Sequence, residues 1–174
     1  MNCRNLITVF LNSMKEEITE ALSWITRLLD AGGVPRQFVG GLAARAYGGT
    51  RELNDIDLYV PDSDLDRIAE AGAAHLVREP RHHFDKHWDL IFLQFLFAGR
   101  QIEIAGADSA RVWDSVSGRW RPADVDFSRS VVCRVEGFCV PIMPLSQLMD
   151  YKRGLARPVD LVDLAEIAEA QASQ

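Results

Sequence analysis

The chain has 174 residues, of which 48% are hydrophobic and 25% are charged, a length and composition that favour one domain with a full hydrophobic core. Its formal net charge of −6 and pI near 5.2 argue against strong nonspecific binding to nucleic acid. No apolar run is long enough to span a bilayer, and the three cysteines, Cys3, Cys133 and Cys139, have no metal-ligand spacing and cannot all pair with one another, which suggests a reducing compartment. We therefore expect a cytoplasmic protein that is not bound to a membrane.

The first predicted element is a helix over residues 14–31. Ser13 and Glu16 have the spacing of a capping box, which places the start of this helix at Met14. We therefore expect residues 1–13 to be a loosely ordered tail and residues 14–174 to form a single domain.

A glycine pair follows the next predicted strand. The apolar run over residues 37–40 is typical of a buried strand, and Gly40 and Gly41 let the backbone turn tightly and approach a ligand. A short helix is predicted over residues 42–47. Its free backbone N–H groups would face the turn, which is a favourable place for a phosphate group.

Two acids share one face of the strand predicted over residues 54–60. Asp55 and Asp57 are two residues apart, so their side chains are separated by about 6.7 Å on a strand. At an effective dielectric constant of 20 their repulsion costs about 2.5 kcal/mol, which a bound cation would relieve. Magnesium suits such a pair because it prefers hard oxygen ligands. The alternative is that both acids are surface residues at the end of a strand.

The rest of the chain predicts an α+β fold in which helices pack against a mixed, mostly antiparallel sheet. Glu103 lies between two isoleucines in the second strand of a predicted hairpin, where it belongs either to a site or to the solvent face of an edge strand. The remaining predicted elements are a helix over 64–77, strands over 88–97, 101–105, 131–135 and 138–142, a mobile loop over 115–129, and helices over 145–155 and 160–172.

The Gly-Gly pair, thirteen further residues and then Asp-Ile-Asp-Leu resemble the signature of the nucleotidyltransferase superfamily, which shares the catalytic core of DNA polymerase beta. Among its small bacterial members, the chain is similar to lincosamide and aminoglycoside nucleotidyltransferases and to abortive-infection toxins. The resemblance implies that Asp55, Asp57 and Glu103 are the catalytic and metal-binding acids. It also implies that Gly40 and Gly41 bind the nucleotide. The chain has Leu53 where the family often has threonine, which leaves the subgroup open.

A second resemblance covers residues 144–167, where the family has a lysine, an arginine and an Asp-x-x-Asp pair. Lys152, Arg157, Asp160 and Asp163 occupy these positions. The resemblance implies that Lys152 binds the nucleoside triphosphate, whereas the later three residues tie the helices together. Arg51 matches a further family position, where it either contacts phosphate or pairs with a strand acid.

The implied function is metal-dependent transfer of a nucleoside monophosphate to a hydroxyl group, with Mg²⁺, or Mn²⁺, as cofactor and a nucleoside triphosphate as donor. The acceptor is open: the same core modifies antibiotics, tRNA ends and protein hydroxyl groups. An antibiotic-resistance enzyme would have an acidic acceptor cleft, and a toxin acting on tRNA would have a basic rim. The alternative from another class is a catalytically inactive nucleotide-binding component, regulatory or part of a toxin–antitoxin pair.

Two further clusters carry weaker signals. A zinc site is conceivable among three histidines and two acids, but they lack an established ligand spacing, which favours a polar loop beside the active site. Four aromatic residues either stack on a ligand or fill the core. These two groups are His82, His83, His87, Asp85 and Asp89, and Trp88, Trp113, Trp120 and Phe127.

Overall fold

The computed structural model describes the backbone of residues 3–173 and the side chains of residues 16–173, and it confirms the expected α+β fold. Within that range the strands form one nine-stranded sheet in the order β7-β6-β4-β5-β2-β1-β9-β8, with β3 paired to β4. Two of the strand pairs are parallel, β1 with β9 and β2 with β5, and the others are antiparallel. The strands are β1 (Gln37–Phe38), β2 (Asp55–Val60), β3 (Leu76–Phe84), β4 (Trp88–Phe97), β5 (Arg100–Gly106), β6 (Arg111–Asp114), β7 (Arg119–Pro122), β8 (Val131–Val135) and β9 (Phe138–Ile142).

The central strands β2 and β5 show the alternation expected of strands with one buried face. Ile56 and Leu58 of β2 point into the core, as do Ile102 and Ile104 of β5. The intervening acids therefore lie on the other face of the sheet, because successive side chains of a strand point to opposite sides.

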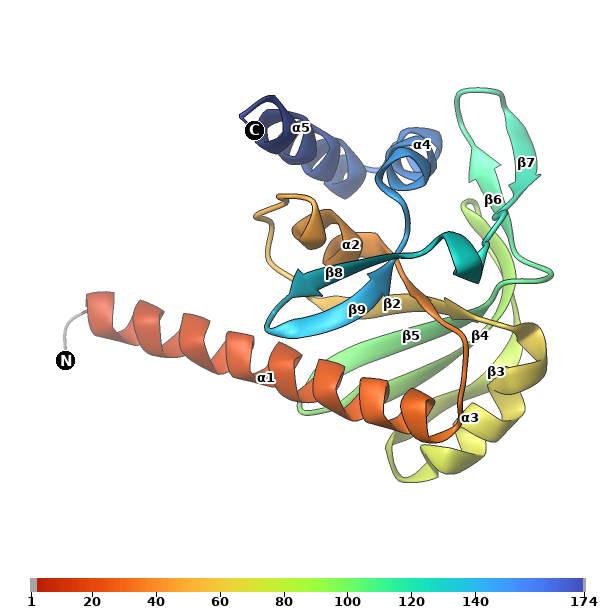
Figure 1. Ribbon diagram of the computed structural model, residues 1–174, viewed down its shortest axis with the longest axis horizontal. Helices are drawn as coiled ribbons and strands as arrows, with labels where there is room; N and C mark the ends of the chain where they lie inside the picture. The colour runs from red at the N-terminus through yellow and green to blue at the C-terminus, as the bar shows by residue number, and fades with distance from the viewer. Residues whose placement is uncertain (1–2, 174) are drawn as a thin grey trace.

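Helix α1 (Cys3–Ala31) covers the core face of the sheet (Figure 1). Four of its side chains recur at helical spacing and are at most 3% exposed: Ile18, Leu22, Ile25 and Leu29. The predicted start at Met14 is wrong, because the helix already begins at Cys3. The side chain of Ser13, on which the predicted capping box depends, lies outside the described residues.

Helices α4 (Leu145–Leu155) and α5 (Pro158–Ala172) lie across the sheet from α1, above the short helix α2 (Gly40–Ala46) (Figure 1). The buried side of helix α5 carries charged as well as apolar side chains, since Asp160 and Asp163 are fully buried. It begins at Pro158, two residues before the predicted start, because Arg157 and Asp160 form a capping box.

Three strands were not predicted. The expected helix over 64–77 is shorter, since α3 (Leu65–Ala71) ends at Gly72 and β3 begins at Leu76. Strand β3 is an edge strand with mostly exposed or partly exposed side chains, so it lacks an apolar alternation in the sequence. Strand β7, which pairs with β6, is likewise an edge strand with exposed or partly exposed side chains, and it replaces part of the predicted mobile loop.

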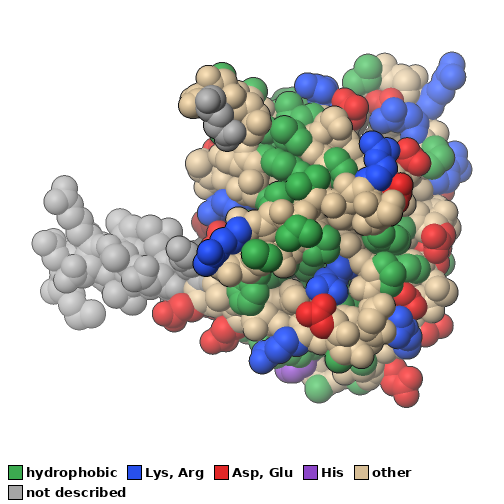
Figure 2. All heavy atoms as spheres, viewed as in Figure 1, with side chains coloured by type: hydrophobic (Ala, Val, Ile, Leu, Met, Phe, Trp, Pro, Cys, Tyr) green, Lys and Arg blue, Asp and Glu red, His purple; other side chains and the backbone are tan. Residues whose placement is uncertain are grey.

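The surface on the view of Figure 2 carries basic and acidic side chains side by side, without a continuous field of either sign. Within residues 3–173, none of the helices combines the length and the apolar composition that crossing a bilayer requires.

Phe38 tests how far the fold depends on its central strands. Its side chain is fully buried where β1 pairs with Leu58 of β2 and Ile142 of β9. We expect Phe38→Ala to lower the free energy of unfolding by about 3–5 kcal/mol, because it removes an aromatic ring and leaves a cavity. Urea denaturation measures this loss. Val116→Ala is the control, since Val116 is 79% exposed and its loss should stay within about 0.5 kcal/mol. Equal losses would contradict the described core.

Candidate active site

A pocket of about 330 Å³ opens on the face of the sheet away from α1. Acidic side chains from β2 and β5 form one wall. Four aromatic side chains also line the pocket and are called its aromatic wall below, namely Tyr59, Trp88, Phe92 and Tyr151. Such a combination of a few polar groups with apolar walls is typical of a small-molecule site.

The three predicted acids meet in this pocket. Asp55 and Asp57 lie two residues apart on β2, and Asp57 is directly opposite Glu103 on the parallel strand β5. All three line the pocket. Gln94 donates a hydrogen bond of 3.0 Å to Glu103, whereas the side chains of residues 16–173 provide no hydrogen-bond donor to the carboxylates of Asp55 and Asp57.

The crowding of these acids changes their protonation. Burial, followed by the charges of Asp55 and Glu103, raises the pKa of Asp57 to about 8, against the opposing effect of Arg157 and Lys152. Burial and the charge of Asp55 also raise the pKa of Glu103. In the absence of a cation, Asp57 therefore keeps its proton at neutral pH.

The donor chemistry of this site fits a hard divalent cation. Carboxylate oxygens that lack protein hydrogen-bond donors and repel one another are suited to Mg²⁺, which shares its coordination shell between carboxylates, waters and phosphates. Among the side chains that the structure describes, no three His, Cys, Asp or Glu residues are already gathered as a complete ligand set. Other ligands would thus have to complete the shell of a cation at Asp55 and Asp57.

Gly40 lies against the acid site. It has a φ of +61°, and a β-carbon at this position would overlap Oδ2 of Asp57. The backbone N–H of Val39 donates to the carbonyl oxygen of Asp57 over 2.9 Å, which fixes the approach of the two segments. Gly41 does not line the pocket; it packs against Arg51 instead, whose Nη2 is 2.9 Å from where a β-carbon of Gly41 would lie.

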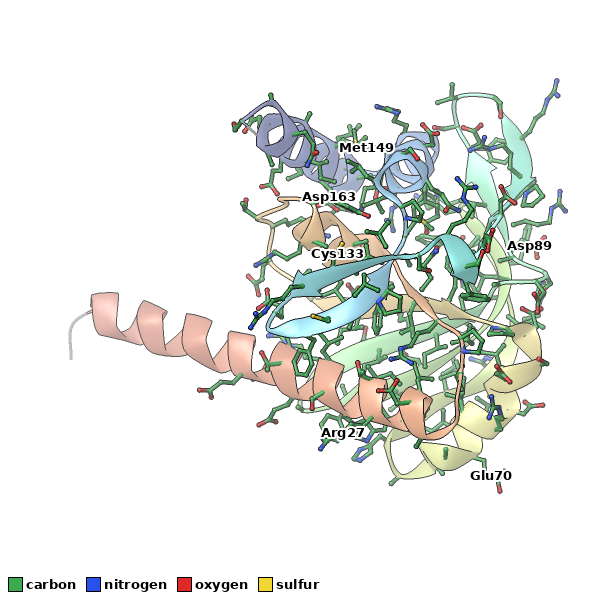
Figure 3. The ribbon with its side chains drawn as sticks, in the orientation of Figure 1. Arg27, Glu70, Asp89, Cys133, Met149 and Asp163 are labelled. Carbon is green, nitrogen blue, oxygen red and sulfur yellow. The ribbon has the colours of Figure 1, made fainter. Side chains whose placement is uncertain are left out.

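Lys152 and Arg51 do not line the pocket either. Lys152 is 1% exposed, and its Nζ lies 2.7 Å from Asp163 and 3.3 Å from Asp160. Arg51 donates from Nε to Asp163 over 3.0 Å. In Figure 3 Asp163 lies between α5 and the α2 segment, where it joins the two cations. The nucleotide-binding roles predicted for Lys152 and Arg51 stay predictions. In this arrangement both side chains pair with Asp163 and do not line the pocket.

Arg157 lines the pocket, which the sequence did not predict. Its guanidinium group donates to both carboxylate oxygens of Asp160, over 2.7 Å and 3.0 Å, and its Cζ lies 4.8 Å from the centre of the Trp88 ring. The Arg-Pro-x-Asp sequence at the start of α5 carried a signal for the pair with Asp160, but nothing in it pointed to the pocket.

Tyr151 joins the aromatic wall to α4. Its hydroxyl oxygen accepts a hydrogen bond of 3.2 Å from Nε1 of Trp88. Burial raises the pKa of Tyr151 to about 12, so the hydroxyl group stays protonated at neutral pH. The wall therefore presents a neutral hydroxyl group beside the acids.

The other aromatic and histidine residues separate into different environments. Trp113 and Trp120 contact each other at 5.7 Å between ring centres, and Phe127 packs against the core. Of the histidines, His83 lines the pocket and pairs with Asp85 over 3.3 Å, whereas His82 pairs with Asp89 over 2.7 Å. The described side chains form no zinc-binding group here.

No protein-family model matches the sequence, and curated proteins gave no match either. Solved structures do match the fold. A protein from Thermotoga maritima assigned as a nucleotidyltransferase superposes with a TM-score of 0.61 at 20% identity, covering 88% of this chain and 93% of its own.

Two antibiotic-modifying enzymes are also similar in structure. The lincosamide adenylyltransferase LnuA, solved with lincomycin, has a TM-score of 0.58 at 14% identity and covers 86% of this chain and 95% of its own. ANT(2″)-Ia, solved with adenylyl-2″-tobramycin, has a TM-score of 0.58 at 15% identity and covers 89% of this chain and 90% of its own. These similarities establish the nucleotidyltransferase fold that the sequence predicted.

Replacing Gly40 tests its contact with Asp57. Gly40→Ala forces alanine into a left-handed conformation, at a cost of about 1–3 kcal/mol, and also pushes a methyl group against the carboxylate. Gly33→Ala is a matched control, because Gly33 has the same φ of +61° and no atom within 4 Å of the added carbon. We expect urea denaturation to show a larger loss of unfolding free energy for Gly40→Ala. Equal losses would refute the close contact.

Asp57 should make stability depend on pH. In metal-free protein the folded state keeps the Asp57 proton up to about pH 8, whereas an unfolded aspartate loses it near 3.8. Between these values the folded state binds more protons, so the free energy of unfolding falls as pH rises.

We therefore expect Asp57→Asn in EDTA to unfold at a higher temperature than the wild type at pH 8 and to show a flatter dependence on pH between 4 and 8. Each kcal/mol corresponds to about 2–4 °C. Thermal melts over this pH range measure the effect, with Asp150→Asn as the control because its side chain is 69% exposed. Parallel curves for Asp57→Asn and the wild type would show that Asp57 is not the group responsible.

Proposed function

We propose that this protein is a metal-dependent nucleotidyltransferase that moves a nucleoside monophosphate from a nucleoside triphosphate to an acceptor hydroxyl group. The observation that carries the proposal is the convergence of Asp55, Asp57 and Glu103 on one pocket, with Gly40 against Asp57. The fold shared with lincosamide and aminoglycoside adenylyltransferases supports it.

The acids of β2 would hold the cofactor. Asp55 and Asp57 offer oxygen ligands to Mg²⁺ or Mn²⁺, and Glu103 lies directly beside Asp57 to complete a second position or to act on the acceptor. When bound, the metal would neutralise part of the negative charge of the phosphates. Asp57 must lose its proton to bind it, which couples metal binding to pH.

The reaction itself exchanges one bond to phosphorus for another. The acceptor oxygen attacks the α-phosphorus, its proton passes to Glu103, and the bond from the α-phosphorus to the leaving pyrophosphate breaks. Burial raises the pKa of Glu103, which makes its carboxylate a stronger base than an ordinary glutamate. The main work of the protein is to position these groups.

The donor would use the other walls of the pocket. Tyr59, Trp88, Phe92 and Tyr151 provide flat apolar surfaces for a base or an acceptor ring. Gly40 lines the pocket against Asp57, and its backbone amide would bind a phosphate oxygen. We retain Gly41, Arg51 and Lys152 as an outer layer of the nucleotide site that shapes it without facing the pocket.

For the acceptor we propose a small hydroxylated molecule, ahead of a tRNA or protein hydroxyl. The pocket volume of about 330 Å³ is at the lower end of the range for small ligands. Mixed charge on the surface of Figure 2 provides no extended basic track for a polynucleotide on that face. Free thiols at Cys133 and Cys139 and the use of nucleoside triphosphates fit a cytoplasmic location.

The decisive test combines nucleotide binding with turnover. We expect one of ATP, GTP, CTP and UTP to raise the unfolding temperature of the wild type in a Mg²⁺-dependent manner, by the equivalent of about 2.7 kcal/mol at a hundred times its Kd. Asp57→Asn should remove the Mg²⁺-dependent part and abolish pyrophosphate release with any hydroxyl acceptor. Asp150→Asn, at an exposed site, should retain both.

Full turnover by folded Asp57→Asn protein would overturn the metal assignment. Tight nucleotide binding by the wild type without pyrophosphate release on any acceptor would instead favour the inactive nucleotide-binding component.

A further inference from the structure

Arg157 is the one lysine or arginine among the described residues that lines the pocket. A triphosphate donor brings several negative charges to a place that already holds three acids, so it requires positive charge that faces the pocket. The two cations expected to supply it are directed elsewhere, because Lys152 and Arg51 both pair with Asp163.

The guanidinium group of Arg157 is held in a fixed orientation. Its Nε and Nη2 donate to the two oxygens of Asp160, and the backbone N–H of Arg157 also donates to Asp160, over 3.2 Å. One face of the group lies over Trp88. These contacts leave Nη1 without a hydrogen-bond acceptor among the described residues, on a side chain that is 28% exposed. A guanidinium group fixed in this way is suited to bind phosphate oxygens.

The surrounding ion pairs leave Arg157 with unbalanced positive charge. Asp160 is shared by Arg157 and Lys152, and Asp163 is shared by Lys152 and Arg51. Three cations thus share two buried carboxylates. Arg157 is the member of this cluster that reaches the pocket, and its charge, with that of Lys152, opposes the rise in the pKa of Asp57. The excess charge is therefore exerted on the acid site.

We propose that Arg157 binds the β- and γ-phosphates of the donor and then the leaving pyrophosphate, and that Lys152 is a positioning residue that holds Asp160 beneath it. This inference rests on the proposed nucleotidyl transfer. It moves the predicted phosphate contact from Lys152 to Arg157. Lys152 acts indirectly: by neutralising Asp160 and Asp163 it leaves the charge of Arg157 available to the ligand.

Calorimetric titration of Arg157→Gln tests the inference through the difference between triphosphate and monophosphate affinity. The probes are ATP, GTP, CTP and UTP, their monophosphates and inorganic tripolyphosphate, each in EDTA and in Mg²⁺. We expect Arg157→Gln to lose about ten- to a hundredfold in affinity for the triphosphates and tripolyphosphate, the usual effect of removing a hydrogen bond to a charged group. Monophosphate affinity should change by less than about threefold, because a monophosphate lacks the β- and γ-phosphates that Arg157 would contact.

Two further variants separate phosphate binding from a structural role. Arg157→Lys keeps the charge but not the paired donors, so it should recover only part of the triphosphate affinity. Arg153→Gln is the matched control: Arg153 is 56% exposed, pairs only with exposed Asp150 among the described side chains and lies outside the pocket. Its affinities should equal those of the wild type.

Should Arg157→Gln be too unstable to titrate, the double variant Arg157→Gln with Asp160→Asn removes the carboxylate that has lost its arginine partner and should show the same loss of discrimination. Arg157 variants that weaken all probes equally, or that keep the wild-type ratio of triphosphate to monophosphate affinity, would overturn the inference while leaving the proposed function intact. A wild type that binds none of the probes would overturn the proposed function and this inference with it.

Discussion

The repulsion among Asp55, Asp57 and Glu103 is the constraint on which the rest of the site depends. Parallel pairing of β2 with β5 sets Asp57 beside Glu103, and the two-residue period of β2 places Asp55 on the same face. The protein does not relieve this repulsion with hydrogen bonds to Asp55 and Asp57 from its described side chains. Burial, together with the charges of Asp55 and Glu103, keeps Asp57 protonated to about pH 8 instead, which leaves a carboxyl group that can exchange its proton for a cation.

The neighbouring segments are built around that arrangement. Gly40 has no side chain because the carboxylate of Asp57 occupies the space, and its positive φ turns the chain into α2. On the opposite side, α4 and α5 carry a buried network of ion pairs that ends at Arg157. Removing one member of such a network leaves a buried charge unpaired, which is costly, so α4 and α5 are held together. Negative charge on the sheet thus faces positive charge from the helices across the pocket.

Some elements could be predicted because they follow local rules. Glu103 between Ile102 and Ile104 alternates as a half-buried strand must, and the sequence therefore placed the acid on the face away from the core. Strand β3 could not be predicted in the same way. It lies at the edge of the sheet, so its side chains alternate between exposed and partly exposed without an apolar pattern in the sequence. Whether this segment forms a strand depends on its pairing with β4.

The sequence by itself determined the acids and the glycine turn, because the spacing of Asp55 and Asp57 on a strand and the backbone freedom of Gly40 are local properties. It also determined the α+β class through the periods of its apolar residues. Only the tertiary structure decided which cation faces the acids. Lys152 and Arg157 lie on adjoining segments with the same charge, and the burial of Asp160 and Asp163 between the helices draws Lys152 inward while Arg157 stays at the pocket. Such a division depends on how distant segments pack, which no local pattern records.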